Sequence, residues 1–254
     1  MSVTSEERPP RGRGAGLAIG AGLLAVLAKL KGGLVLLKGL KLGKLLLTMG
    51  SMFVMVWFEA RRGGWPFGLG FVLLILVHEL GHGLAIKRAG LAAGYPVFIP
   101  FFGAFISLKG QVRSPLVEAE IALAGPLAGT VGALACAALW LVTRGHLWLA
   151  LAHVGFFLNL FNMTPLSPLD GGRVAQLFSR RAWIVGVVII GAMFIATQTP
   201  QLLLIGLLAL TSRRTAVGAE EVDPAQRRNM AVHYFGLCAF LAAGIYLTSG
   251  MLGQ

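Results

Sequence analysis

The sequence predicts an all-α polytopic membrane protein with about six to seven transmembrane helices and a short re-entrant β-type segment near residues 95–110. The first observation is composition: 56% of the 254 residues are hydrophobic, only 13% are charged, and the mean hydropathy is +0.78. The second is that apolar residues fall in runs of about the 20 residues that a helix needs to cross a bilayer. The third is that the 22 Lys and Arg residues stand in short clusters between those runs. The net charge of +12 therefore indicates contact with a lipid bilayer and not with nucleic acid.

The N-terminal region is basic and divides into two parts. Residues 1–14 are polar, contain prolines and glycines, and are predicted to be a disordered cytoplasmic tail. Residues 15–44 are rich in Leu, Ala and Gly but are interrupted by five lysines. That pattern suits an interfacial segment whose lysines reach the headgroups. A short span over 15–28 followed by a basic hairpin is the alternative, and the sequence leaves both open.

The first spans follow directly. An apolar run covers roughly Leu45 to Phe58, with a start nearer Leu40 as the alternative because a span needs about 20 residues, and it completes a predicted region 15–64. Two arginines and two glycines at 61–64 predict a turn. A second helix is expected from Pro66 to Arg88, because proline suits the first turn of a helix, and Gly90 then ends it.

Residues 91–115 differ in kind from the spans around them. The stretch from Tyr95 to Ile106 is aromatic and β-branched, contains two prolines, and is too short to cross a membrane as a helix. It fits extended chain that folds back into the membrane, which requires protein or a water-filled cavity around it. A surface-associated loop is the alternative.

The second half of the chain contains further apolar runs. Two are read as a hairpin of short spans, although a single kinked helix would also fit, and a polar linker precedes the last one. In order, the predicted elements are spans at Leu116–Val142 and His146–Met163, short spans at Trp183–Ala196 and Gln201–Leu210, the linker Arg213–Asn229, and a span at Met230–Ser249.

The basic clusters predict orientation. If the N-terminus is cytoplasmic and the spans alternate, one side of the membrane receives only Arg61, Arg62 and Arg144. The other side receives the lysines of 29–44 and Lys87, Arg88, Lys109, Arg113, Arg173, Arg180, Arg181, Arg213, Arg214, Arg227 and Arg228. By the positive-inside rule that richer side is cytoplasmic. We therefore expect a cytoplasmic N-terminus, and a site around residues 78–82 that opens on the cytoplasmic side.

The sequence H-E-x-x-H occupies residues 78–82 in the second predicted helix. Positions four apart stack on one helix face, so His78 and His82 can offer two imidazoles to one metal ion. Glu79 lies about 100° around the helix axis, close enough to act as a base toward water at that metal. The alternative is that both histidines are ordinary core residues. Ionisable groups inside an apolar span favour function.

A third ligand is needed for a zinc site with one open position. Asp170 follows the fourth span on the same side, in a stretch where Pro165 and Pro168 forbid a regular helix and two glycines allow sharp bends. Its carboxylate could approach the two histidines. Alternatively, Asp170 could simply cap the next helix.

These motifs resemble those of the site-2 protease family, zinc metalloproteases that cut substrates within the membrane. Residues 78–82 match the family's H-E-x-x-H, and Asn162 to Gly171 match its N-x-x-P-x-x-x-x-D-G with the same spacing. The segments Ala124–Leu127 and Phe102–Phe105 resemble the start of its third core helix and its re-entrant β-loop. The resemblance covers roughly 65–215, the predicted catalytic core. No stretch resembles a PDZ or CBS domain, and Gly129 stands where the family often has Asn.

The resemblance implies a residue for each role. His78, His82 and Asp170 would bind Zn²⁺, Glu79 would be the general base, and Asn162 would hold the substrate or the oxyanion. Phe102, Gly103, Ala104 and Phe105 would bind substrate. The linker and extra helix over 216–254 lie outside the matching core.

The expected function is that of an intramembrane zinc metalloendopeptidase in a bacterial cytoplasmic membrane. It would cleave membrane-spanning segments of anchored proteins in regulated intramembrane proteolysis. An extended substrate would pair with residues 97–106 by strand addition. The alternative is a zinc-binding membrane protein without proteolytic activity, either a transporter or an inactive scaffold.

Overall fold

The computed structural model of the chain describes residues 41–99, 103–110, 112, 114–178, 180–198, 202–203, 206–207 and 222–252. The predicted tail (1–14) and most of the predicted interfacial segment (15–44) lie outside these residues. The chain forms two compact units, Met1–Leu47 and Thr48–Gln254. The second unit contains every contact described below.

The first described element, α2 (Lys41–Arg88), includes both the first predicted span and the predicted motif helix. The turn expected over 61–64 is shorter than predicted, because the backbone leaves helical geometry only at Gly64 (φ 82°, ψ 164°). That left-handed φ is readily adopted by glycine, which has no Cβ. Pro66 follows at the start of the next helical stretch, where no backbone N–H is needed.

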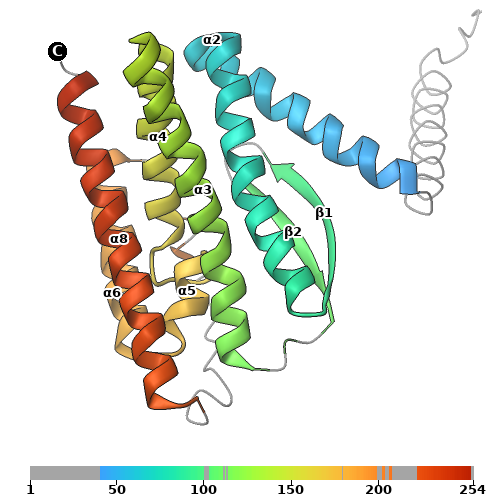
Figure 1. The fold of residues 1–254 in the computed structure, drawn as a ribbon, viewed down its shortest axis with the longest axis vertical. Helices are drawn as coiled ribbons and strands as arrows, with labels where there is room; N and C mark the ends of the chain where they lie inside the picture. The colour runs from blue at the N-terminus through green and yellow to red at the C-terminus, as the bar shows by residue number, and fades with distance from the viewer. Residues whose placement is uncertain are drawn as a thin grey trace, which may run out of the picture. The chain divides into compact units, whose positions relative to one another are not determined.

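Within α2, residues 48–63 and 65–88 form two limbs that fold back on each other at Gly64 (Figure 1). The limbs are in close contact at Gly68, where a Cβ would lie 2.7 Å from the Ala60 nitrogen and 2.7 Å from the Val56 oxygen. Buried Val56 and Val72 contribute to one hydrophobic cluster across the two limbs. The first limb thereby holds the second limb in place.

The extended segment predicted after α2 is a hairpin of β1 (Ala92–Ile99) and β2 (Gly103–Lys109), paired antiparallel. This small sheet lies against the first limb of α2 through two side-chain hydroxyls. Thr48 Oγ1 donates to the Pro96 carbonyl (2.7 Å), and Ser51 Oγ accepts from the Phe98 N–H (3.2 Å). The extended conformation is confirmed; its insertion into the membrane stays a prediction.

The next helix, α3 (Pro115–Thr143), has defined signals at both ends. Ser114 caps it by accepting a hydrogen bond from the Val117 N–H (3.2 Å), with Pro115 in the first turn. At its other end Arg144 adopts a left-handed conformation (φ 56°), and its N–H donates to the Trp140 carbonyl (2.7 Å). These bounds agree with the predicted span to within about a residue at each end.

Among the described residues, the further helices with given bounds are α4 (His146–Asn162), α5 (Asp170–Ala175), α6 (Arg180–Thr197) and α8 (Pro224–Leu252). The helices α3, α4 and α8 lie side by side in Figure 1 and share one core, which includes Ala133, Leu151, Phe156 and Leu241. The short α5 lies beside α3 and α6.

The prediction for the last helix was wrong at its start. α8 begins at Pro224, inside the predicted linker, because proline fits a first helical turn and polar residues extend the helix beyond its apolar part. Hydropathy marks only the apolar part. The predicted span Gln201–Leu210 lies largely outside the described residues, which include only 202–203 and 206–207 of it.

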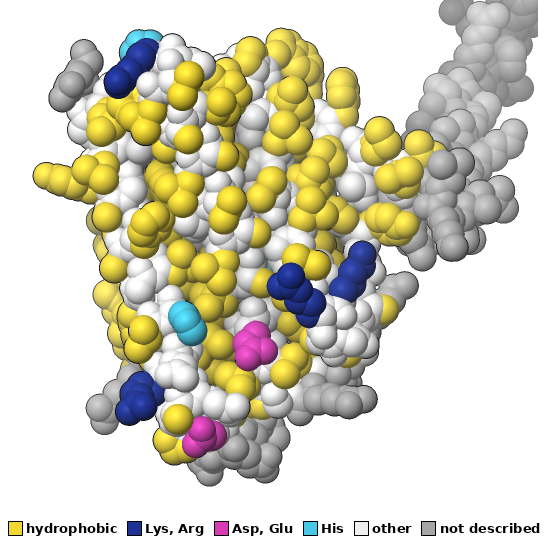
Figure 2. Space-filling model, viewed as in Figure 1, with side chains coloured by type: hydrophobic (Ala, Val, Ile, Leu, Met, Phe, Trp, Pro, Cys, Tyr) yellow, Lys and Arg dark blue, Asp and Glu magenta, His cyan; other side chains and the backbone are white. Residues whose placement is uncertain are grey.

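Three helices of the described residues are long and apolar enough to cross a membrane: Leu45–Arg88, which contains both limbs of α2, Pro115–Thr143 and Pro224–Leu252. Two shorter apolar helices are His146–Asn162 and Ile184–Ile195. In Figure 2 hydrophobic side chains cover much of the visible face, and most charged side chains lie in its lower half. The chain is thus organised as an integral membrane protein, and the count of six to seven spans stays a prediction.

Candidate metal centre

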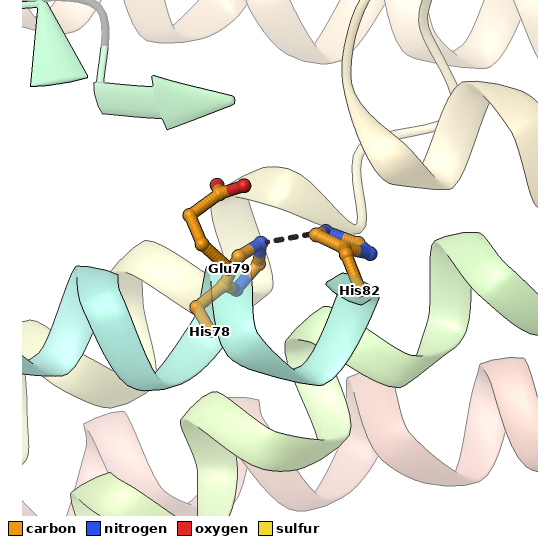
Figure 3. Close-up of side chains that lie close together, drawn as sticks. All are labelled: His78, Glu79 and His82. Carbon is orange, nitrogen blue, oxygen red and sulfur yellow. Dashed lines mark hydrogen bonds between the residues drawn. The ribbon is translucent and has the colours of Figure 1, made fainter. Parts of the chain in front are cut away.

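The two histidines of H-E-x-x-H lie one helical turn apart on the second limb of α2 (Figure 3). His78 and His82 are buried, with 3% and 7% of their surface exposed. Their rings meet edge to face, and their Nε2 atoms are 3.1 Å apart. Helix geometry alone thus brings two imidazole nitrogens to one point, as the spacing predicts.

Asp170 reaches the same point from the end of residues 163–169, the broken segment that joins α4 to α5. Its Oδ2 lies 3.1 Å from His78 Nε2 and 3.2 Å from His82 Nε2. Asp170 is the first residue of α5, whose N-cap is Leu169 without a side-chain cap hydrogen bond. The alternative reading of Asp170 as a helix cap is therefore wrong, since its carboxylate faces the histidines.

Glycines allow the broken segment to wind this tightly. A Cβ on Gly171 would lie 2.0 Å from the Met163 carbonyl oxygen, and one on Gly172 would lie 2.4 Å from the Ser167 nitrogen. No larger residue fits either position without moving backbone atoms. The two glycines after Asp170 therefore fix how close the carboxylate comes to α2.

Asn159 of α4 orients the first histidine. His78 Nδ1 lies 2.8 Å from Asn159 Oδ1, and Asn159 Nδ2 donates to the Gly155 carbonyl (2.7 Å). Because the amide nitrogen is engaged by that carbonyl, the amide oxygen faces His78 and must accept. His78 Nδ1 therefore carries the proton.

The second histidine is oriented by backbone. His82 Nδ1 lies 2.8 Å from the Ile121 carbonyl of α3, which can only accept, so this nitrogen also carries a proton. In the neutral form of each ring the Nε2 atom is then unprotonated. Two nitrogen lone pairs and one carboxylate oxygen converge, all within 3.1–3.2 Å of one another.

Such convergence fits a metal cation. Lone pairs this close repel unless a positive charge lies between them. Around tetrahedral zinc, with ligands at about 2.0–2.1 Å, donor atoms stand roughly 3.3 Å apart. Hydrogen bonds from the outer nitrogen to an acceptor are also the usual support of zinc-bound histidine. The donor set and its spacing therefore fit a zinc ion held by two imidazoles and a carboxylate.

Glu79 completes the centre. Its carboxylate lies within 4.8 Å of nitrogen atoms of both histidines, and the residue is 4% exposed. In Figure 3 its side chain rises on the same side of the helix as the two rings. A carboxylate there could exchange protons with water at a metal ion held by the two histidines.

The small residues of α3 make room for the site. A Cβ on Gly125 would lie 2.2 Å from His82 Nε2, and one on Gly129 would lie 2.2 Å from Asn159 Oδ1. The resemblance placed Ala124–Leu127 at the start of a core helix and gave neither glycine a role. The structure shows that Gly125 accommodates the His82 ring and that Gly129 accommodates the Asn159 amide.

Other predicted site residues stand elsewhere. Asn162, the last residue of α4, is half-buried and forms no described hydrogen bond with the three converging side chains. Gly103, Ala104 and Phe105 belong to β2, with Phe105 51% exposed, and Phe102 lies outside the described residues. Asn159 was not predicted at this site. Its only signal was a buried amide in an apolar helix, which indicates an interhelical hydrogen bond without naming the partner.

Comparison with known proteins agrees with this geometry. The sequence pattern of peptidase family M50 matches residues 66–146. The chain is 34% identical over 128 residues to Rip3 of Mycobacterium tuberculosis, covering 45% of this chain and 32% of that protein. It is 30% identical over 148 residues to MJ0611 of Methanocaldococcus jannaschii, covering 50% of this chain and 75% of that protein. Both relatives are named as zinc metalloproteases.

The match with Rip3 spans about a third of that protein's length, whereas the match with MJ0611 spans three quarters of it. The region matched by the family pattern contains the two histidines and Glu79. The chain therefore belongs to peptidase family M50, the site-2 protease family.

Proposed function

We propose that this protein is a zinc metalloendopeptidase that hydrolyses peptide bonds within membrane-spanning segments of anchored proteins. The observation that carries the proposal is the convergence of two imidazole Nε2 atoms and one carboxylate oxygen at 3.1–3.2 Å. The names of its relatives support the same chemistry. In this proposal His78, His82 and Asp170 hold zinc.

The chain's own residues would carry the proton transfers. Bound zinc supplies Lewis acidity, which polarises a carbonyl and acidifies water. Glu79 accepts the proton of the attacking water and later donates it to the leaving amine nitrogen. Asn159 and the Ile121 carbonyl keep the Nε2 atoms directed inward, and Asn162 holds the substrate backbone near the end of α4.

The sheet would hold the substrate in extended form. Backbone groups on the outer edge of β1 are already hydrogen-bonded, because the Pro96 carbonyl accepts from Thr48 and the Phe98 N–H donates to Ser51. Within the described residues β2 pairs only with β1, so its outer edge is the one available for strand addition. A photoreactive residue at Ala104 should crosslink to substrate, whereas one at Val97 should not; equal crosslinking would refute this edge.

The orientation and substrate class complete the proposal. The six-to-seven-span topology predicted from the basic clusters places the centre in the cytoplasmic half of a bacterial cytoplasmic membrane. The substrate would be a membrane-spanning regulator cut in regulated intramembrane proteolysis. Its helix must unwind locally, because a helical peptide bond is shielded from attack. Protease accessibility of tagged termini in spheroplasts tests the orientation, and a periplasmic N-terminus would contradict it.

The test is Glu79→Gln in purified protein with a membrane-spanning substrate. Loss of a general base lowers the rate by about 100-fold or more, while both histidines and Asp170 keep their zinc. Glu120→Gln is the matched control, since Glu120 is exposed on α3. Wild-type cleavage by the Glu79 variant would remove the assigned base. Zinc flux into vesicles without cleavage would instead support a transporter.

A further inference from the structure

The last helix, α8, lies outside the residues matched by the family pattern, yet it contacts the segment that carries Asp170. The Tyr234 hydroxyl donates a hydrogen bond to the Met163 carbonyl. Tyr234 is 4% exposed, and its ring packs against both Phe178 (centroids 5.8 Å apart) and Phe235 (5.1 Å apart). This polar contact from α8 is therefore buried and fixed in geometry.

The Met163 carbonyl lies at the start of the broken segment and contacts two other parts of the chain. Met163 follows the last residue of α4, and its N–H bonds to the Asn159 and Leu160 carbonyls. Its carbonyl oxygen also lies against Gly171, where a Cβ would come within 2.0 Å. One oxygen atom thus contacts α8 and the residue that follows Asp170.

We propose that Tyr234 is a positioning residue for the metal centre: by holding the Met163 carbonyl, α8 sets the position of Asp170 relative to His78 and His82. The inference rests on the proposed zinc site. Without the hydroxyl a buried carbonyl loses its partner, which is costly enough to shift the backbone. That shift passes to Gly171 because no space separates the two.

A second contact between α4 and α8 provides the matched comparison. His153 Nδ1 lies 2.9 Å from Thr248 Oγ1, in a pair that is 95 residues apart in sequence. Thr248 is buried, as Tyr234 is, but its partner is in the middle of α4 and not in the broken segment. Loss of this contact loosens α8 without touching Asp170.

The experiment compares Tyr234→Phe, Thr248→Val and wild-type protein, full length and metal-free in detergent, titrated with Co²⁺. Co²⁺ is a suitable probe because its d–d absorption reports ligand geometry and its affinity reports ligand placement. We expect Tyr234→Phe to bind Co²⁺ about tenfold more weakly, with a changed d–d spectrum. Thr248→Val should stay within about twofold of wild type, with an unchanged spectrum, even where it lowers the melting temperature.

Each other outcome is decisive. An unchanged affinity and spectrum in Tyr234→Phe would overturn the positioning role while leaving the zinc site intact. Equal weakening in both variants would overturn it too, because α8 would then act only through general stability. Failure of wild-type protein to bind Co²⁺ would overturn the zinc site and the positioning role together. Tyr234→Phe keeps the ring that packs against Phe178 and Phe235, so this aromatic packing is retained.

Discussion

The two sides of the metal centre are built differently. His78 and His82 stand on a regular helix, so their separation follows from four residues of helical geometry. Asp170 begins the short helix α5 directly after a segment without regular structure, and we infer that its position depends on Gly171, the Met163 carbonyl and Tyr234. The helical side is defined locally, and the other side is defined by contacts between distant parts of the chain.

This difference determines how the centre responds to substitutions on each side. On the helical side a disturbance moves a side chain and leaves the backbone in place. On the Asp170 side the same disturbance must move backbone, because the atoms in contact are carbonyl groups. A substitution on the helical side should therefore lower metal affinity without lowering stability, whereas one on the Asp170 side should lower both.

The largest effect is expected for Gly171→Ala. Its Cβ would meet the Met163 oxygen at 2.0 Å and the Thr164 oxygen at 2.5 Å, so the segment must rearrange. We expect a loss of about 3 kcal/mol in stability together with loss of zinc. Melting temperature and metal content in detergent check both. Gly191→Ala on α6 is the control, because a Cβ there meets nothing within 4 Å.

Gly125→Ala should give the contrasting result on the helical side. The new Cβ would stand 2.2 Å from His82 Nε2, and the ring can rotate away. Zinc affinity should fall by about 100-fold while the melting temperature changes little. Gly236→Ala on α8, which meets nothing within 4 Å, should change neither quantity. Equal losses of stability in Gly125→Ala and Gly171→Ala would remove the distinction between the two sides.

A smaller and more specific effect is expected for Asn159. Asn159→Ala leaves His78 Nδ1 without its acceptor, and loss of such a partner lowers metal affinity by about tenfold. Asn162→Ala, one turn along the same helix, should leave zinc affinity unchanged and lower the rate of cleavage. Zinc titration and a cleavage assay on both variants separate the roles. Reversed results would assign the orienting role to Asn162.

Several parts of this account were predictable from the sequence. The spacing of H-E-x-x-H places both histidines on one helix face. The prolines before Asp170 mark a break in the helix, from which its carboxylate can approach the histidines. The extended conformation of β1 and β2 followed from the aromatic and β-branched residues over 95–106, but their pairing into a hairpin was not predicted. Each of these signals is local, so one stretch of sequence is enough to read it.

The remaining features depend on tertiary contacts. Asn159 meets His78 across 81 residues, and Tyr234 meets Met163 across 71, with no local pattern to connect either pair. No local pattern indicates that Gly125 makes room for the His82 ring or that Gly129 makes room for the Asn159 amide. The turn at Gly64 was predicted too long, since only one of its residues has to leave the helix.

The most direct test of the central claim is zinc K-edge absorption spectroscopy of the purified protein and of Asp170→Ala. The proposed centre predicts one zinc per chain with two imidazole ligands and oxygen donors at about 2.0–2.1 Å. In Asp170→Ala zinc should be lost or retain fewer oxygen donors. An identical spectrum and metal content in both proteins would contradict the convergence of His78, His82 and Asp170 on one ion.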